Sequence, residues 1–248
     1  MASRKAQKER ARQERLAAER AAAEQAARRR RLGIGGGVGA AIVVGVIIAI
    51  VAASSGGSGS STSGSGSSPK LVTTSTASLG HLKPAPSPGP LGLEGVPVPQ
   101  GPALATPVST GATVDGIQCN TNEQLVFHIH SHLTIFVDGA ARQVPQLVGY
   151  DDNTCLHWLH THAPDGIIHM ESPAQRTYTL GNFFDIWGQP LGPSRVGPAT
   201  GKVTAFYNGA LYRGNPRNIP LNSHSQVQLD VGTPLIAPEK ISFAGTGL

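Results

Sequence analysis

Histidine is concentrated in one part of this chain, with a spacing that suggests metal coordination. Seven of the nine histidines lie between positions 128 and 169. In the stretch FHIHSHLTIFVDG, residues 127–139, every second position from His128 through His130 to His132 is a histidine. Because successive side chains of a β-strand point to opposite faces, a strand here would place the three imidazoles on one face.

A second group of histidines falls in the stretches CLHWLHTH and GIIHME, which predict a hairpin around a Pro-Asp-Gly turn. A two-residue turn would place His162 opposite His169 and His160 opposite Glu171, whereas a four-residue loop would place His160 opposite His169. Both registers keep these four residues on one face, and only a three-residue loop would separate them. Directly opposed Cβ atoms lie about 4.5–5.5 Å apart, close enough for two imidazoles to bind one ion.

The faces opposite the histidines are apolar. They carry Phe127, Ile129, Leu133 and Ile135 on the first strand and Leu159, Ile168 and Met170 on the hairpin. We therefore expect each strand to turn one face to a core and the other to a shared histidine surface. The candidate metal ligands on that surface are His128, His130, His132, His160, His162, His169 and Glu171.

Neutral imidazoles gathered on one surface are suited to zinc or copper, with iron, nickel and cobalt as further options. Protonated imidazoles would repel one another, and a bound ion relieves that repulsion by using the neutral form. The alternatives are a pH-sensing surface and a purely structural cluster. His157 is interpreted as structural, His224 as an outlier, and His81 has no assigned role.

Three functions fit this pattern. The first is a module that sequesters, delivers or senses copper or zinc. The second is a zinc enzyme, a hydrolase or a carbonic-anhydrase-like lyase, with three histidine ligands and Glu171 or Asp138 as base. The third is a protein-interaction domain whose histidines only pack. The excess of imidazole favours binding, and the chain contains no nucleophile, phosphate-loop or dinucleotide motif.

Strand and turn signals dominate from residue 125 onward. Hairpins are expected at Asp138-Gly139, where the chain returns through 142–148, and at Asn208-Gly209. Thr179 can cap a short helix over LGNFFDIW, and HSQVQLDVG predicts a further strand. Residues 117–248 are thus predicted to form a mainly β (α+β) domain, a compact antiparallel arrangement of several hairpins with one short helix.

Cys119 and Cys155 are the only cysteines. An even count in an oxidising compartment favours a disulfide between them. The alternative is that Cys155, two residues before His157, is a thiolate ligand. A blue-copper site with Met170 is disfavoured because that side chain points away from the histidines.

The N-terminal part predicts a membrane anchor. Residues 32–53 are 22 uncharged residues, long enough for a transmembrane helix that contacts lipid. Residues 1–31 carry eleven Lys/Arg and four Glu, which predicts a basic cytoplasmic tail and an extracytoplasmic C-terminus. A cleaved signal peptide ending near Ala53 is the alternative. Residues 54–116, rich in Gly, Ser and Pro, are expected to form a disordered linker.

Two consequences concern partners. Small residues recur at four-residue intervals in the anchor, a pattern that favours pairing of two transmembrane helices into a homodimer. They are Gly33, Gly37, Ala41, Gly45, Ala49 and Ala53. Downstream of residue 31 the chain has nine basic and eleven acidic residues, so the folded domain lacks the positive charge that nucleic-acid binding requires.

The stretches FHIHSHLTIFVDG, CLHWLHTHAPDGIIHMESP and FFDIWGQPL together resemble a type of bacterial extracytoplasmic domain with an N-terminal membrane anchor. This resemblance implies an extracytoplasmic location and the unity of residues 117–248, and it implies no activity. In fragments only, FHIH and LHWLH are similar to the zinc-binding strands of α-carbonic anhydrases, and HTH with a later Glu is similar to cupins. The chain departs from the α-carbonic anhydrases in the size of its domain. It departs from the cupins in the spacing from His162 to Glu171.

Overall fold

The computed structural model describes residues 71–152 and 154–248. The predicted basic tail (1–31), transmembrane helix (32–53) and first part of the linker (54–70) lie outside the described residues, so those predictions stay predictions. Within the described part of the chain, no helix has the length and apolar character needed to cross a bilayer.

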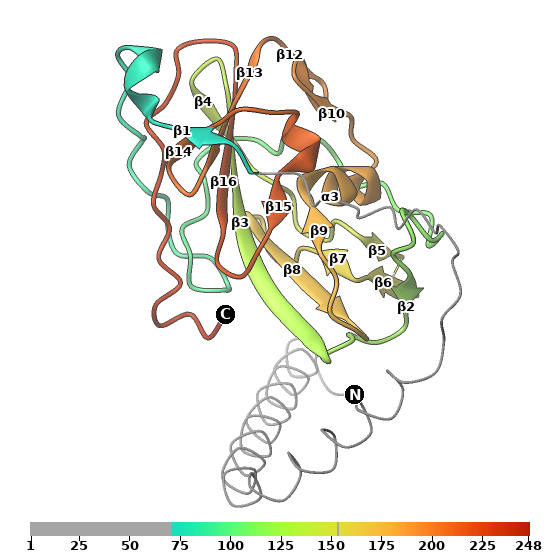
Figure 1. Cartoon of the computed structure of the whole chain (residues 1–248). Helices are drawn as coiled ribbons and strands as arrows, with labels where there is room; N and C mark the ends of the chain where they lie inside the picture. Colours follow the sequence, from blue (N-terminus) through green and yellow to red (C-terminus); the bar gives the residue numbers. More distant parts are fainter. Residues whose placement is uncertain (1–70, 153) are drawn as a thin grey trace, which may run out of the picture. The chain divides into compact units, whose positions relative to one another are not determined.

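The main sheet has eight strands, in the order β1-β14-β13-β16-β3-β8-β7, with β4 also paired to β3 (Figure 1). Their bounds are β1 Thr73–Thr74, β3 Phe127–Val137, β4 Ala140–Arg142, β7 Leu159–His160, β8 Ile167–Ser172, β13 Val203–Tyr207, β14 Ala210–Tyr212 and β16 Gln226–Val231. All pairs are antiparallel except β16 with β3, which is parallel. The predicted all-antiparallel arrangement is therefore wrong at this pair, because turn signals fix only the direction of strands that are neighbours in sequence.

The predicted hairpin turns are confirmed. β3 and β4 are joined by Asp138-Gly139, and β13 and β14 by Asn208-Gly209. All four of these residues have positive φ, between 49° and 80°, as a two-residue turn of this hand requires. β7 pairs with β8 in the register of the four-residue loop, with His160 opposite His169.

The predicted helix is also confirmed. Helix α3, Leu180–Trp187, begins at Thr179, whose hydroxyl accepts a hydrogen bond from the Asn182 N–H in a capping box. It ends at Gly188, which takes the left-handed conformation with φ 70°. Its aromatic side chains are fully buried, which anchors the helix against the sheet.

Three small sheets and two 3-10 turns complete the described part. The sheets are β2 (Cys119–Asn120) with β6 (Cys155–His157) and β5 (Tyr150–Asp151); β10 (Leu191–Gly192) with β11 (Arg195–Val196) and β12 (Ala199–Thr200); and β15 (Pro220–Leu221) with β9 (Tyr178–Thr179). The 3-10 turns are η1 (Thr76–Leu79) and η2 (Pro216–Asn218).

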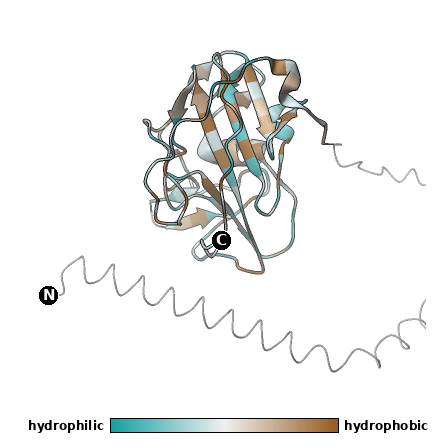
Figure 2. Cartoon of the chain, turned by 90° about the vertical axis from the view of Figure 1, so that its left-hand side faces the viewer, coloured by the Kyte–Doolittle hydropathy of each residue, from teal (hydrophilic) through white to brown (hydrophobic). Residues whose placement is uncertain are grey.

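The main core lies on one face of the sheet. It contains the residues predicted for the apolar faces, with Leu133, Ile135, Leu159, Ile168 and Met170 buried and Phe127 and Ile129 packed against them. Hydrophobic and hydrophilic residues alternate along the strands in Figure 2, as expected for strands whose faces meet different surroundings. The predicted core face is confirmed, and the histidines occupy the other one.

Residues 71–116, predicted as linker, belong to the folded unit. β1 extends the sheet beside β14, and Val96 is fully buried. The backbone of this segment bonds to the rest of the domain, for example from Lys83 N–H to Leu235 O and from Leu104 N–H to Gln143 O. The linker boundary at 116 is therefore wrong, because a Gly/Pro-rich stretch without periodicity can still cover a sheet when neighbouring segments satisfy its backbone.

The predicted disulfide is confirmed: Cys119 and Cys155 are joined, with Cα atoms 5.4 Å apart. This bond links the starts of strands β2 and β6, which also pair. It closes a loop of 36 residues, which in the chain-entropy model adds about 3–4 kcal/mol of stability. Cys155 is therefore not a thiolate ligand.

Candidate metal centre

Three neighbouring strands position the centre. β8 lies between β3 and β7, and His169 on β8 is directly opposite both His130 on β3 and His160 on β7 (Figure 1). Two residues further along each strand, and so on the same face, Glu171 is opposite His128. Directly opposed residues point to the same face, so the two predicted histidine faces join into one surface.

The first ligand group lies between β3 and β8 and consists of His128, His130, His169 and Glu171. His128 Nε2 is 3.0 Å from His130 Nε2 and 3.2 Å from Glu171 Oε1. Two nitrogens bound to one tetrahedral zinc at about 2.0–2.1 Å would be about 3.3 Å apart. The observed spacing is thus within a few tenths of an ångström of that of a filled site.

The second group lies between β7 and β8 and consists of His160, His162, His169 and Glu171. His160 Nε2 is 2.9 Å from His162 Nε2 and 3.8 Å from Glu171 Oε1. His160 Nδ1 lies 2.9 Å from the carbonyl oxygen of His157. Donation from Nδ1–H to this carbonyl leaves the Nε2 lone pair free for a metal, the usual support of a ligating histidine.

His169 lies between two carboxylates. Its Nε2 is 2.8 Å from Glu94 Oε1, and its Nδ1 is 3.3 Å from Glu171 Oε1. Burial alone would lower the pKa of His169, but the hydrogen bonds to Glu171 and Glu94 outweigh it and raise this pKa to about 9. In the metal-free protein His169 is therefore a cation that lies between the two carboxylates.

Two other buried histidines of the centre, His130 and His160, are neutral near pH 7. Burial, followed by the charges of His169 and His128, lowers the pKa of His130 to about 3. Burial and the charge of His169 lower the pKa of His160 to about 3 as well. Neutral imidazole is the form that binds metal, so these two ligands need lose no proton on binding.

The carboxylates are ionised and incompletely bonded. Burial would raise the pKa of Glu94, but hydrogen bonds from His162 and His169 hold it at about 2. The pKa of Glu171 is likewise lowered, because bonds from His128 and His169 outweigh the effect of burial. The second oxygens, Glu94 Oε2 and Glu171 Oε2, are buried without a hydrogen-bond partner. A buried anionic oxygen without a partner is costly, and a cation would satisfy both.

Glu94 and Glu123 also lie at the centre, although the sequence pattern did not predict them. Glu94 Oε1 is 3.3 Å from His162 Nδ1, and Glu123 Oε1 is 3.7 Å from His162 Nε2. Glu94 is one of only two acidic residues between positions 54 and 116. The sequence signal that indicates Glu94 is a single carboxylate in an otherwise apolar, Pro-rich stretch.

His132 does not join either group. Its Nε2 lies 2.9 Å from Asp165 O and its Nδ1 3.4 Å from Thr134 Oγ1. The loop at Gly166 covers the ring so closely that a Cβ there would be 3.0 Å from His132 Nε2. Burial lowers the pKa of His132 to about 4. The structure thus makes this predicted ligand a buried, hydrogen-bonded histidine.

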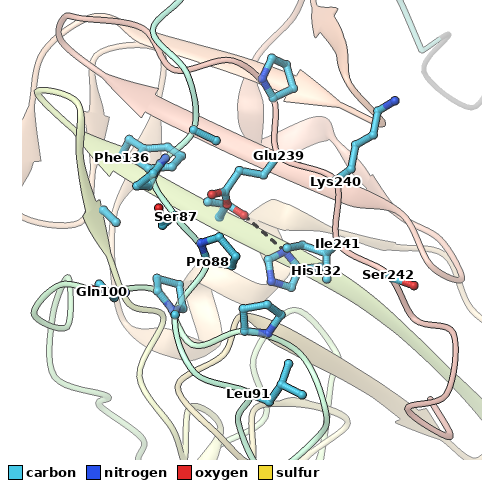
Figure 3. A pocket seen from close by; sticks show the side chains of 18 of the residues that line it. Ser87, Pro88, Leu91, Gln100, His132, Phe136, Glu239, Lys240, Ile241 and Ser242 are labelled. Atoms are coloured by element: carbon cyan, nitrogen blue, oxygen red, sulfur yellow. Dashed lines mark hydrogen bonds between the residues drawn. The ribbon is translucent and has the colours of Figure 1, made fainter.

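A groove of about 510 Å³ lies beside His132. In Figure 3, His132 and Glu239 project into the same space from different segments, with Pro88 and Phe136 near them and a hydrogen bond ending at His132. The groove is lined by parts of residues 85–100 and 238–244, by Ala141, and by His132, Thr134 and Phe136 on strand β3. It lies outside both ligand groups.

The remaining candidates lie elsewhere. His157 is buried with its ring nitrogens 2.9 Å from Gly149 O and 2.8 Å from Ala112 O, which fits the structural role expected for it. His224 is exposed and stacks on Phe243. Asp138, offered as a base, occupies the hairpin turn eight positions beyond His130 and is roughly 26 Å from it along the strand. It is therefore too far from the histidines to act on a bound substrate.

Comparison with protein-family models, with curated proteins and with solved structures finds no match. The functional argument therefore rests on the geometry of the histidine and glutamate side chains.

Proposed function

We propose that this protein is a membrane-anchored, extracytoplasmic metal-binding protein that holds zinc or copper through clustered strand histidines. One observation carries the proposal: two His-x-His pairs converge on the buried Glu171, whose second oxygen has no partner. The sequence supports the location, through the apolar stretch 32–53 and the basic residues before it. A reporter fused after Leu248 should be active only outside the cytoplasm.

The choice of zinc or copper follows from the donor atoms. Imidazole nitrogen with a minority of carboxylate oxygen suits zinc and copper(II) better than the oxygen-preferring magnesium and calcium. The described residues contain no free cysteine, and Met170 is buried in the core on the opposite face, so soft sulfur ligands are absent from the surroundings of the described histidines. Zinc and copper(II) therefore fit these ligands better than copper(I), which prefers sulfur.

A zinc-dependent enzyme is the second candidate, favoured by solvent access at the rim. The side chain of His128 is 39% exposed and that of His162 is 23% exposed, whereas the histidines between them are buried. An ion at the rim could keep a water ligand in an open position, with a neighbouring carboxylate as base. The surplus of ligands beyond three argues for binding as the primary role.

The test uses the full chain, purified in detergent, stripped with chelator and then given Zn²⁺ or Cu²⁺. Its melting temperature should rise with either ion, because only the folded protein offers the site. His130→Asn and His160→Asn should each reduce the rise, because each variant loses a buried ligand. His224→Asn is the matched control, since this exposed histidine lies outside the cluster and asparagine tolerates its positive φ of 57°. A melting temperature that neither Zn²⁺ nor Cu²⁺ changes would contradict the proposal. The protein-interaction domain would then be the remaining alternative.

A further inference from the structure

We infer that the centre binds two metal ions at once, with Glu171 as the ligand they share. The inference rests on the proposed function and adds to it the number of ions and the residue that bridges them.

The number of donors is the first argument. Five imidazoles and the carboxylates of Glu94 and Glu171 lie in one connected network of contacts no longer than 3.8 Å. A tetrahedral zinc or a four-coordinate copper uses four ligands. One ion can bind only four of these seven residues, whereas two four-coordinate ions that share Glu171 can bind all seven.

The arrangement of the donors is the second argument. His128 and His130 come from β3, while His160 and the adjoining His162 come from β7 and the residues after it. β8 separates β3 from β7, and neighbouring strands lie about 4.8 Å apart, so the two pairs start from backbones about 10 Å apart. Within each pair the Nε2 atoms converge to 3.0 and 2.9 Å. Each pair therefore forms its own half-site, on either side of β8.

Glu171 belongs to both half-sites. Its Oε1 is 3.2 Å from His128 Nε2 on one side and 3.8 Å from His160 Nε2 on the other. Its side chain is only 3% exposed, and its Oε2 has no hydrogen-bond partner. A carboxylate placed in this way can give an oxygen to each of two ions. In known sites that hold two metal ions, the ions lie about 3.5–4 Å apart.

Glu94 completes the arrangement on the side of β7. Its Oε1 contacts His169 Nε2 and His162 Nδ1, and its Oε2 is buried without a partner. Two divalent ions bring four positive charges, and Glu94 and Glu171 supply two negative charges next to them. Glu123, 3.7 Å from His162 Nε2 at the more exposed edge, supplies a third.

The first test is the metal content of the full-length protein in detergent, measured by elemental analysis after loading with Zn²⁺ and removal of excess ion. Two ions per chain are expected. The double variants His128→Asn/His130→Asn and His160→Asn/His162→Asn should each bind one, and the control His224→Asn should bind two. One ion in the unmodified protein would overturn this inference and leave the proposed function standing. No bound ion would overturn the proposed function itself.

The second test can overturn the inference with the unmodified protein alone, so its outcome does not depend on the folding of a variant. The protein loaded with two equivalents of Cu²⁺ should show a magnetically coupled pair by electron paramagnetic resonance, with reduced intensity at the usual field and a half-field signal. Glu171→Gln should remove the coupling while circular dichroism shows the fold retained. Two uncoupled Cu²⁺ ions of full intensity in the unmodified protein would overturn the shared ligand.

Discussion

Nε2–H of His169 donates a hydrogen bond of 2.8 Å to Oε1 of Glu94, a residue 75 positions earlier in the chain. This contact joins the irregular segment before residue 117 to the strand at the middle of the histidine surface. Glu94 thereby fixes the orientation of a ring that both ligand groups share. A fragment that begins after Glu94 would lack part of the centre.

Glu94→Ala is therefore expected to weaken metal binding. Removing a carboxylate that orients a ligating histidine typically costs 10–100-fold in metal affinity. Titration calorimetry of the chelator-treated full chain with Zn²⁺ would measure this loss. The control is Lys83→Ala in the same segment, since Lys83 joins the domain through its backbone N–H and carbonyl. Equal affinity of Glu94→Ala and the unmodified protein would show that Glu94 plays no part in the site.

His132→Ala tests whether His132 is a metal ligand, as the sequence pattern predicted, or a buried structural residue, as its contacts indicate. The loss of its ring leaves the Asp165 carbonyl oxygen and the Thr134 hydroxyl without their partner and opens space in a buried region. We expect a loss of about 2–3 kcal/mol in the free energy of unfolding, measured with urea in the presence of chelator. The number of metal ions bound per chain should not change. A lost ion would return His132 to the ligand set.

Alternation of side chains along a strand predicted much of the site, because it is a local property with a period of two. It placed His128 and His130 on one face and His160, His169 and Glu171 on another, and the pairing of β8 with both β3 and β7 joined them. The pattern also predicted which apolar residues form the core.

The parts that sequence did not predict depend on contacts between distant segments. Alternation identifies the face on which His132 lies, but not that the loop at Gly166 would cover it. Glu94 comes from a stretch with no periodicity, so nothing local to it indicates its contact with His169. The parallel direction of β16 beside β3 follows from the whole path of the chain between them.

The disulfide makes a prediction about stability. Reduction of Cys119–Cys155 in the unmodified protein should lower the free energy of unfolding by about 3–4 kcal/mol, as expected for a closed loop of 36 residues. Urea unfolding with and without reductant, in chelator, measures the difference. Neither thiol should react with an alkylating reagent until reductant is added. The number of metal ions bound per folded chain should be the same before and after reduction, because neither cysteine belongs to a ligand group.

Acid should destabilise the metal-free protein through His130 and His160. The pKa of each is lowered from the usual 6.5 to about 3 in the folded state. As the pH falls below 6.5 the unfolded chain takes up protons that the folded protein does not, so stability is lost from pH 6.5 down to about pH 3. Each of these two groups contributes a slope of roughly 1.4 kcal/mol per pH unit within that window.

His160→Asn should lower that slope by roughly 1.4 kcal/mol per pH unit, because this group no longer takes up a proton on unfolding. The measurement is the free energy of unfolding by urea between pH 4 and 6.5, in chelator, for the unmodified protein and the variant. His224→Asn, an exposed histidine, serves as the control and should keep the full slope. An unchanged slope in His160→Asn would mean that His160 is already protonated in the folded state, and such an imidazolium could not bind a metal ion.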